Sequence, residues 1–173
     1  QLMAILDTIH FFQDSAGTPW AKIDSECYPI SSTTFKRQLQ RIYFKRHGKT
    51  PYSQALQDVL DQATGIAMFD SSVKDIHIRV AKKGSYIIVD RYDGRTIITP
   101  DGWENDSGTD VNFWKPQGLN ALPQPEDRGD GIELLKEYLN YDSENDFRLM
   151  VGWLLTAYNP ETACPILSLQ GEQ

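Results

Sequence analysis

The chain has 173 residues, of which 40% are hydrophobic, 24% charged and 11% aromatic, so it holds enough apolar material for an ordinary core and is not expected to be disordered. It has no apolar run long enough to span a membrane, and its first residues lack the basic region and cleavage site of a signal peptide, so we expect a cytoplasmic protein without a membrane contact. Cys27 and Cys164 lie far apart without a CxxC motif, which argues against a zinc site or a disulfide framework and predicts two reduced, buried thiols.

Charge is unevenly distributed along the chain, whose net charge is −7. Residues 27–57 contain six basic residues and no acid, whereas the rest holds the other 11 of the 17 basic residues and all 24 acids. An acidic protein with one basic element can bind a polyanion through that element.

The N-terminal region predicts a short helix followed by a β-hairpin. Residues 2–9 carry apolar side chains at helical spacing, and a turn-forming cluster at 14–19 separates two short apolar runs. Tyr28-Pro29-Ile30 predicts an edge strand, because proline cannot donate to a sheet ladder. The predicted order is therefore a helix at 2–9 and strands at 10–13, 20–23 and 28–30.

A pair of helices is predicted next. The first begins after a hydroxyl cap at Ser31 or Ser32 and ends at Gly48, and the second begins at Thr50-Pro51. The first buries the apolar face Phe35, Leu39, Ile42 and Tyr43, and the second buries Leu56, Val59, Leu60, Ala63 and Ala67.

Beyond Phe69 the apolar period falls to two, which predicts an antiparallel β-meander. Its strands are expected at 76–80, 86–92, 95–99 and 111–114. A proline- and glycine-rich linker follows at 115–131, and then helices at 132–139 and 147–158 and an apolar strand at 165–169. The predicted fold is α+β, with an accessory domain at 1–114, the linker at 115–131 and the start of a further domain at 132–173.

A buried strand that runs into a glycine is also how a phosphate-binding loop begins, with the pattern strand, G-x-x-x-x-G-K-[ST], helix. Here the strand at 165–169 precedes Gly171, but the loop residues that would grip phosphate and Mg²⁺ do not follow in the sequence. On this pattern alone, an ordinary strand and turn is the commoner interpretation.

Five stretches carry a family resemblance: 14–23 (DSAGTPWAKI), 43–60 (YFKRHGKTPYSQALQDVL), 76–80 (IHIRV), 99–103 (TPDGW) and 164–173 (CPILSLQGEQ). Over nearly its whole length, the chain resembles the region that precedes the P-loop in phage, plasmid and prophage ATPases related to the helicase half of primase-helicases. The resemblance implies a parent ATPase, helicase-like and active in DNA replication, that binds ATP and Mg²⁺ and can form a homo-oligomer through its ATPase domain. It makes Gly171 the first glycine of the nucleotide-binding loop. It also implies that these 173 residues need no cofactor and do not hydrolyse ATP themselves.

The basic residues of 27–57 predict a nucleic-acid contact. Arg37, Arg41 and Lys45 fall at i, i+4 and i+8, roughly opposite the apolar face, and a helix without acidic i+4 partners differs from the mixed-sign surface of a merely solvated helix. The solvated helix stays the alternative interpretation. The candidate nucleic-acid-binding residues are Lys36, Arg37, Arg41, Lys45, Arg46 and Lys49.

Other candidate chemistry is weaker. The aromatic residues of the meander either stack unpaired bases or fill a core; these are Tyr86, Tyr92, Trp103, Phe113 and Trp114. Trp20 and Trp153 are expected in a core. Asp130, Glu133 and Lys136 form the best carboxylate cluster, but acids at a helix start need no catalytic reason. The three histidines lie far apart and have no nucleophile context, so no catalytic residue is proposed.

The function predicted from the sequence is an accessory domain that binds DNA, single- or double-stranded, or assists assembly in a mobile-element replication ATPase. The alternative is a protein-interaction or oligomerisation module without nucleic-acid binding.

Overall fold

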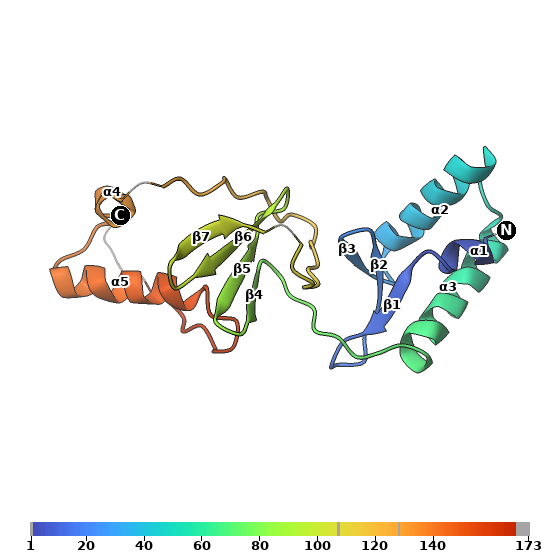
Figure 1. The fold of residues 1–173 in the computed structure, drawn as a ribbon, viewed down its shortest axis with the longest axis horizontal. Coiled ribbons are helices and arrows are strands. Elements are labelled where there is room, and N and C mark those ends of the chain that lie inside the picture. The colour runs from blue at the N-terminus through green and yellow to red at the C-terminus, as the bar shows by residue number, and fades with distance from the viewer. Residues whose placement is uncertain (1, 107, 128, 169–173) are drawn as a thin grey trace. The chain divides into compact units, whose positions relative to one another are not determined.

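The computed structural model describes residues 2–106, 108–127 and 129–168, and it contains two antiparallel sheets and five helices (Figure 1). The predicted α+β class is confirmed. The chain divides into two units, one of residues 1–78 with 109–118 and one of residues 79–108 with 119–173. This division cuts the predicted accessory domain after residue 78.

The first unit contains three strands and three helices. In chain order they are α1 (Met3–Leu6), β1 (His10–Gln13), β2 (Pro19–Ile23), β3 (Glu26–Pro29), α2 (Thr33–His47) and α3 (Ser53–Phe69). The strands form an antiparallel sheet in the order β1-β2-β3, in which Phe12 pairs with Trp20 and Ala21 pairs with Tyr28. The predicted short helix and strands are confirmed here, with ends that differ by one to a few residues.

The helices cover one face of this sheet. α3 packs on β1 and β2, and α2 packs on β3 (Figure 1). The core between them is built from the apolar faces of α2 and α3, from residues 2–9 around α1, and from Ala21 and Ile30, with Phe35, Leu39, Leu56 and Val59 almost inaccessible to solvent. Burying these side chains contributes roughly 1.5–3 kcal/mol each, which holds the helix pair on the sheet.

The opposite face of the sheet is covered by segments that are distant in the sequence. Phe12, Trp20 and Cys27 form a buried cluster against which Ile76 and Trp114 pack. The Lys22 Nζ donates to Asn112 Oδ1 at 3.0 Å. The residues around 112 therefore belong to the first unit, although the meander separates them from it in the chain.

The second unit is built on a four-stranded antiparallel meander. Its strands follow one another in the order β4 (Val80–Lys83), β5 (Tyr86–Asp90), β6 (Arg95–Thr99) and β7 (Gly102–Asn105). The pairs Ile88–Ile97 and Val89–Thr96 set the register of the two central strands. The meander is confirmed, but its limits differ from the prediction at both ends.

The predicted first strand at 76–80 is wrong except for Val80. Arg79 has a left-handed backbone, with φ 67°, which interrupts an extended strand before β4 begins. His77 instead forms a parallel bridge with Phe113, in which the His77 N–H donates to Asn112 O at 3.0 Å and Trp114 N–H donates to His77 O at 2.9 Å. The prediction that residues 111–114 form a strand of the meander is also wrong. Phe113 and Trp114 form bridges with His77 and Cys27, which belong to the first unit.

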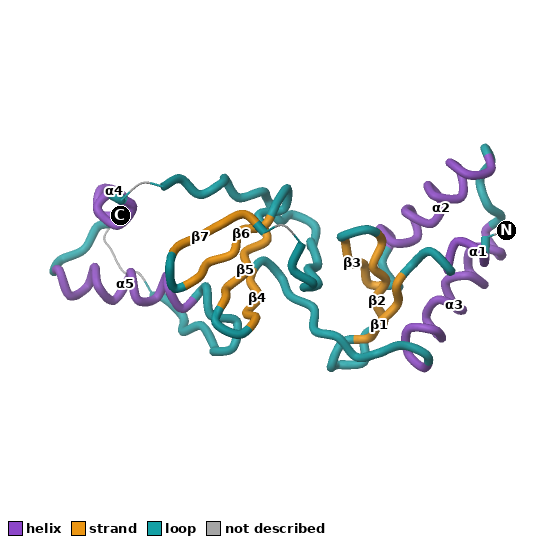
Figure 2. Tube along the Cα trace, viewed as in Figure 1, coloured by secondary structure: helices purple, strands orange, loops and turns teal. Residues whose placement is uncertain are grey.

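The rest of the second unit contains α4 (Gly131–Tyr138) and α5 (Glu144–Thr156). Both helices were predicted, although α5 begins three residues earlier because the Ser143 Oγ accepts a hydrogen bond from Asp146 N–H at 3.3 Å. The long connection between β7 and α4 contains only isolated bridges among its described residues (Figure 2). Within the described ranges, no helix is long and apolar enough to cross a membrane.

The predicted strand at 165–169 is not formed by its described residues. Residues 165–168 pair with no strand, and a strand requires a hydrogen-bonded neighbour. Leu169 and Gly171, the predicted nucleotide-binding glycine, lie outside the described residues.

Candidate nucleic-acid interface

α2 carries the candidate site, and local interactions define both of its ends. The Ser32 Oγ accepts a hydrogen bond from Phe35 N–H at 3.1 Å, which caps the first turn. Gly48, with φ 67°, ends the helix, and its N–H donates to Phe44 O at 2.8 Å. Lys45, Arg46 and His47 occupy the last turn, where positive charge is favoured by the helix dipole.

The inner face of α2 is fixed against β3 and the core. Phe35, Leu39 and Tyr43 are buried, as predicted. The Gln38 Nε2 donates to the Tyr28 hydroxyl at 3.3 Å, and this hydroxyl in turn donates to the Glu26 carboxylate. Partial burial, together with Glu26, raises the pKa of the Tyr28 phenol well above its usual range, so the hydroxyl remains a hydrogen-bond donor to Glu26 even in alkaline solution.

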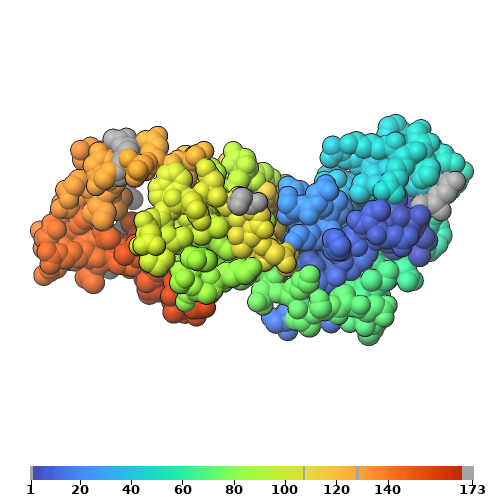
Figure 3. Space-filling view, in the orientation of Figure 1, coloured from blue at the N-terminus to red at the C-terminus, as the bar shows by residue number. Residues whose placement is uncertain are grey.

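The outer face of α2 carries the predicted basic stripe, which we define as Arg37, Arg41 and Lys45. All three side chains are exposed. With about 100° of rotation per residue, they lie on the side of the helix away from the buried face. The structure therefore brings these three predicted residues together along α2, which lies at the surface in the space-filling view, coloured blue to cyan (Figure 3).

The remaining predicted binding residues surround the stripe. Lys36 and Arg46 are exposed on other sides of α2, and Lys49 is exposed in the connection to α3. Across the part of the chain that the structure describes, the six basic side chains have no ion pair or side-chain hydrogen bond. The charge of α2 is therefore available to a partner.

The neighbouring helix has the opposite charge. α3 contains Asp58 and Asp61 and no basic residue, and both carboxylates are exposed, accepting hydrogen bonds from Gln54 at 2.8 Å and Gln57 at 2.9 Å. A polyanion that approaches the helix pair is therefore attracted to α2 and repelled from the exposed face of α3.

The start of α3 differs from the prediction. Tyr52, not Thr50, occupies the N-cap position, because the first helical hydrogen bond runs from Leu56 N–H to Tyr52 O at 3.0 Å. Pro51 thus precedes the cap instead of following it. The side chain of Tyr52 makes no capping hydrogen bond and is 87% exposed.

Phe44 and Tyr52 are aromatic residues that the sequence analysis did not single out. Phe44 is 56% exposed on α2, although its neighbour Tyr43 is buried. The signal was present, because Phe44 does not belong to the apolar series Phe35, Leu39, Ile42 and Tyr43.

The predicted aromatic residues of the meander separate into two groups. Phe113 is buried in the first unit, and Trp114 packs there against the cluster of Phe12, Trp20 and Cys27, so neither lies on the meander. Tyr86, Tyr92 and Trp103 remain on the second unit with partly exposed rings. Trp103 lines a cavity of about 600 Å³.

The predicted burial of two tryptophans and of the two thiols is confirmed only in part. Trp20 is buried, but Trp153 is only half-buried, and its Nε1 donates to Pro165 O at 2.6 Å. Cys27 is buried, whereas Cys164 is exposed, because the segment that carries it packs against no strand.

In the weaker candidate cluster, Lys136 forms two ion pairs and lies over the Phe147 ring, 5.1 Å from its centroid. The Lys136 Nζ lies 3.6 Å from Glu133 and 3.6 Å from Glu144. Desolvation lowers the pKa of Lys136, but Glu133, Glu144 and Tyr141 together raise it by more, so the net shift is upward and the ammonium group stays charged. Among residues 2–106, 108–127 and 129–168, no three His, Cys, Asp or Glu side chains could hold a metal ion together.

Comparison with known protein families, with curated proteins and with solved structures finds no match to this chain. The resemblance to P-loop ATPases therefore stays a prediction, and the function is inferred from the surface of the first unit.

Proposed function

We propose that α2 is a nucleic-acid-binding helix that contacts phosphates without reading base sequence, and that the chain is an accessory domain of a mobile-element replication ATPase. One observation carries the proposal: the basic stripe is exposed and without a partner in the described chain, on a helix that contains no acid. A solvated helix normally mixes signs, whereas a phosphate-binding helix does not.

The spacing of the stripe supports a backbone contact. Residues at i, i+4 and i+8 place about one positive charge on each helical turn of about 5.4 Å. The side chains are long and mobile enough to follow a chain of phosphates, and such contacts carry no sequence information. Binding should therefore tolerate any base sequence.

The test is fluorescence anisotropy of labelled oligonucleotides with the whole chain. Arg37→Glu combined with Arg41→Glu should abolish measurable binding at low salt. The matched control is Lys74→Glu with Lys83→Glu, which changes the net charge equally at exposed positions that do not belong to α2 and should bind as the wild type does. Equal affinities of the wild type and the α2 variant would remove the nucleic-acid role.

A second candidate function is a protein contact through the same helix. The charge difference between α2 and α3 would allow α2 of one copy to face Asp58 and Asp61 of another. In that case the α2 double variant would change the molar mass of the assembly in light scattering and leave nucleic-acid affinity unchanged.

The role in a parent ATPase is supported only by the resemblance. The lysine of a phosphate-binding loop does not follow Gly171 within the 173 residues, so we expect this chain neither to bind nor to hydrolyse ATP. Calorimetric titration with Mg-ATP and a phosphate-release assay test this, and turnover by these residues alone would contradict the proposed division of labour.

A further inference from the structure

Two exposed aromatic rings lie at the same end of the helix pair. Phe44 occupies the last turn of α2 and Tyr52 precedes the first turn of α3, with the connection 48–52 between the two helices. Their side chains are 56% and 87% exposed. A single exposed ring is common on protein surfaces and needs no partner. These two rings differ from the others because they lie at the end of the helix pair that carries the exposed cations Lys45 and Lys49.

Phe44 lies beside the basic stripe. Arg37, Arg41 and Phe44 fall at i, i+4 and i+7, a spacing that places side chains one above another on a single side of a helix. Phe44 therefore lies on the same side of α2 as Arg37 and Arg41, away from the core.

Tyr52 occupies a position where a tyrosine does not help the fold. An N-cap residue is favoured when its side chain accepts a hydrogen bond from the first helical turn, as Ser32 does for α2. Tyr52 makes no such bond. Lys49, exposed in the same connection, adds a positive charge between the two rings in the sequence.

The surroundings favour a polyanion over a protein. α2 and the connection 48–52 contain no carboxylate. Protein–protein interfaces are enriched in arginine and aromatic residues but depleted in lysine. Here three of the six cations are lysines and no acid accompanies them, which matches sites for unpaired nucleic acid, where positive charge is combined with aromatic rings on which bases stack.

We propose that this end of the helix pair binds unpaired nucleic acid, with bases stacked on Phe44 and Tyr52 and phosphates on the basic stripe and Lys49. This inference rests on the proposed function and adds the class of nucleic acid to it. In a duplex the bases are already stacked on one another, so the rings would find no partner there. The site should therefore prefer single strands, with little dependence on base identity.

The experiment compares single-stranded and duplex oligonucleotides of equal length by anisotropy at low salt. Phe44→Leu and Tyr52→Leu keep an apolar side chain but remove the ring. We expect each to weaken single-strand binding at least about fivefold, and the double variant more, with duplex binding unchanged. Tyr52→Phe keeps the ring and should bind nearly as the wild type does.

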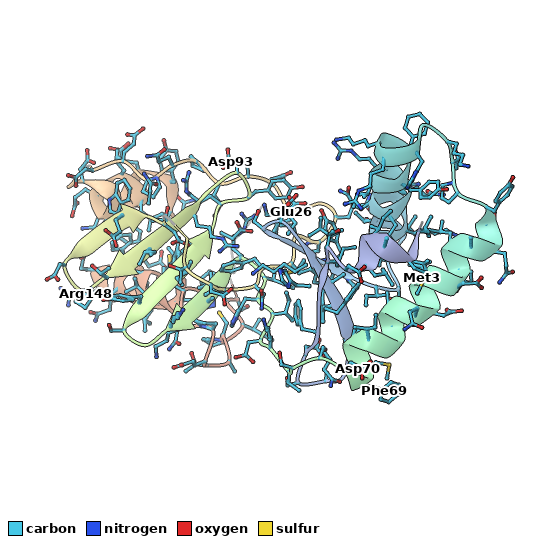
Figure 4. All side chains as sticks on the ribbon, turned by 45° about the vertical axis from the view of Figure 1, so that its right-hand side comes forward. Met3, Glu26, Phe69, Asp70, Asp93 and Arg148 are labelled. Atoms are coloured by element: carbon cyan, nitrogen blue, oxygen red, sulfur yellow. The ribbon has the colours of Figure 1, made fainter. Side chains whose placement is uncertain are left out.

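The matched control is Phe69→Leu. Phe69 is 81% exposed at the far end of α3, where its ring projects away from the helix (Figure 4), and it has no basic stripe beside it. This variant should leave both affinities unchanged. Thermal unfolding of every variant checks that the fold is kept. We expect unchanged midpoints, because the rings of Phe44, Tyr52 and Phe69 are all exposed.

The outcomes separate this inference from the proposed function. If the charge reversals on α2 abolish binding but the leucine variants bind single strands as the wild type does, the stacking site is wrong and the phosphate-binding helix stands. An equal loss of single-strand and duplex affinity in the leucine variants also overturns the preference for unpaired strands. If the charge reversals have no effect, the proposed function itself is wrong.

Discussion

The indole Nε1 of Trp20 donates a hydrogen bond to the Asp14 carboxylate at 2.9 Å, and this bond joins the turn between β1 and β2 to the buried cluster beneath it. The other carboxylate oxygen accepts from the backbone N–H groups of Ala16 at 2.9 Å and Thr18 at 2.8 Å. One side chain therefore closes the hairpin turn and anchors the ring that fills the second face of the sheet.

Asp14→Ala should destabilise the first unit by about 1–3 kcal/mol, because three donors lose a charged acceptor. Asp142→Ala, at an exposed carboxylate in the second unit, should have little effect. Chemical denaturation followed by tryptophan fluorescence measures both. An unchanged midpoint for Asp14→Ala would show that the turn does not depend on this carboxylate.

The stability contributed by Asp14 should depend on pH. Desolvation raises the pKa of this carboxyl, but the hydrogen bonds from Trp20, Thr18 and Ala16 lower it by more, so the net shift is downward from 3.8. The unfolded chain then binds the proton more readily, so the contribution is complete above about pH 5 and is lost as the pH falls through the folded-state pKa. The difference in unfolding free energy between the wild type and Asp14→Ala should shrink at pH 3, in denaturation curves recorded at both pH values.

Leu39→Ala should cost about 2–5 kcal/mol, because Leu39 is buried between α2 and the sheet and its removal leaves a cavity. Nucleic-acid binding should weaken in parallel with the loss of folded α2. Arg41→Gln, on the opposite side of the helix, should weaken binding with an unchanged unfolding midpoint. Equal stability of both variants would place Leu39 outside the core.

The salt dependence of binding reports how many phosphates the protein neutralises. Each cationic side chain that no longer binds a phosphate should reduce the slope of log affinity against log salt by about 0.7 for single strands and about 0.9 for duplex. We expect this change for Arg37→Gln, Arg41→Gln and Lys45→Gln taken singly, and none for Lys74→Gln. A slope unaffected by all three stripe variants would exclude direct binding of phosphates by the stripe.

Tyr52→Asn should have opposite effects on stability and binding. Asparagine is a favoured N-cap residue, so α3 should gain about 0.5–1 kcal/mol in the unfolding free energy. Single-strand affinity should fall, because the ring is lost. Thermal unfolding measures the change in stability, and anisotropy on the same sample measures the change in single-strand affinity. A loss of stability would mean that the Tyr52 side chain stabilises the fold and is not kept for binding a partner.

Proteolysis should begin in the region predicted as the linker, residues 115–131. Its described part has no helix or strand before Gly131, and Glu126 and Asp127 are exposed. Asn120 and Leu122 are tied to the second unit, since Asn120 O accepts from Arg79 at 2.6 Å and Leu122 N–H donates to Arg91 O at 3.0 Å. We expect the first cut after residue 122, identified by mass spectrometry. A first cut within α2 or α3 would contradict the packed helix pair.

Local patterns in the sequence determined most elements of this protein. The apolar spacing of Phe35, Leu39 and Tyr43, the Ser32 cap and the Gly48 stop describe α2 almost to the residue, because a helix is built from contacts between residues a few positions apart. The basic stripe followed from the same spacing. Its exposure on the structure agrees with a charge pattern that is already visible in residues 27–57.

Only the tertiary structure decided which segments are neighbours. His77 and Phe113 lie on either side of the meander in the chain and pair in the first unit, where Trp114 covers the face of the sheet that carries Trp20. No local pattern encodes such a pairing, because an apolar strand-like segment fits any sheet edge with a matching face. The exposure of Tyr52 depends in the same way on how the helices pack, since its ring, which lies outside both helices, could equally have filled a core.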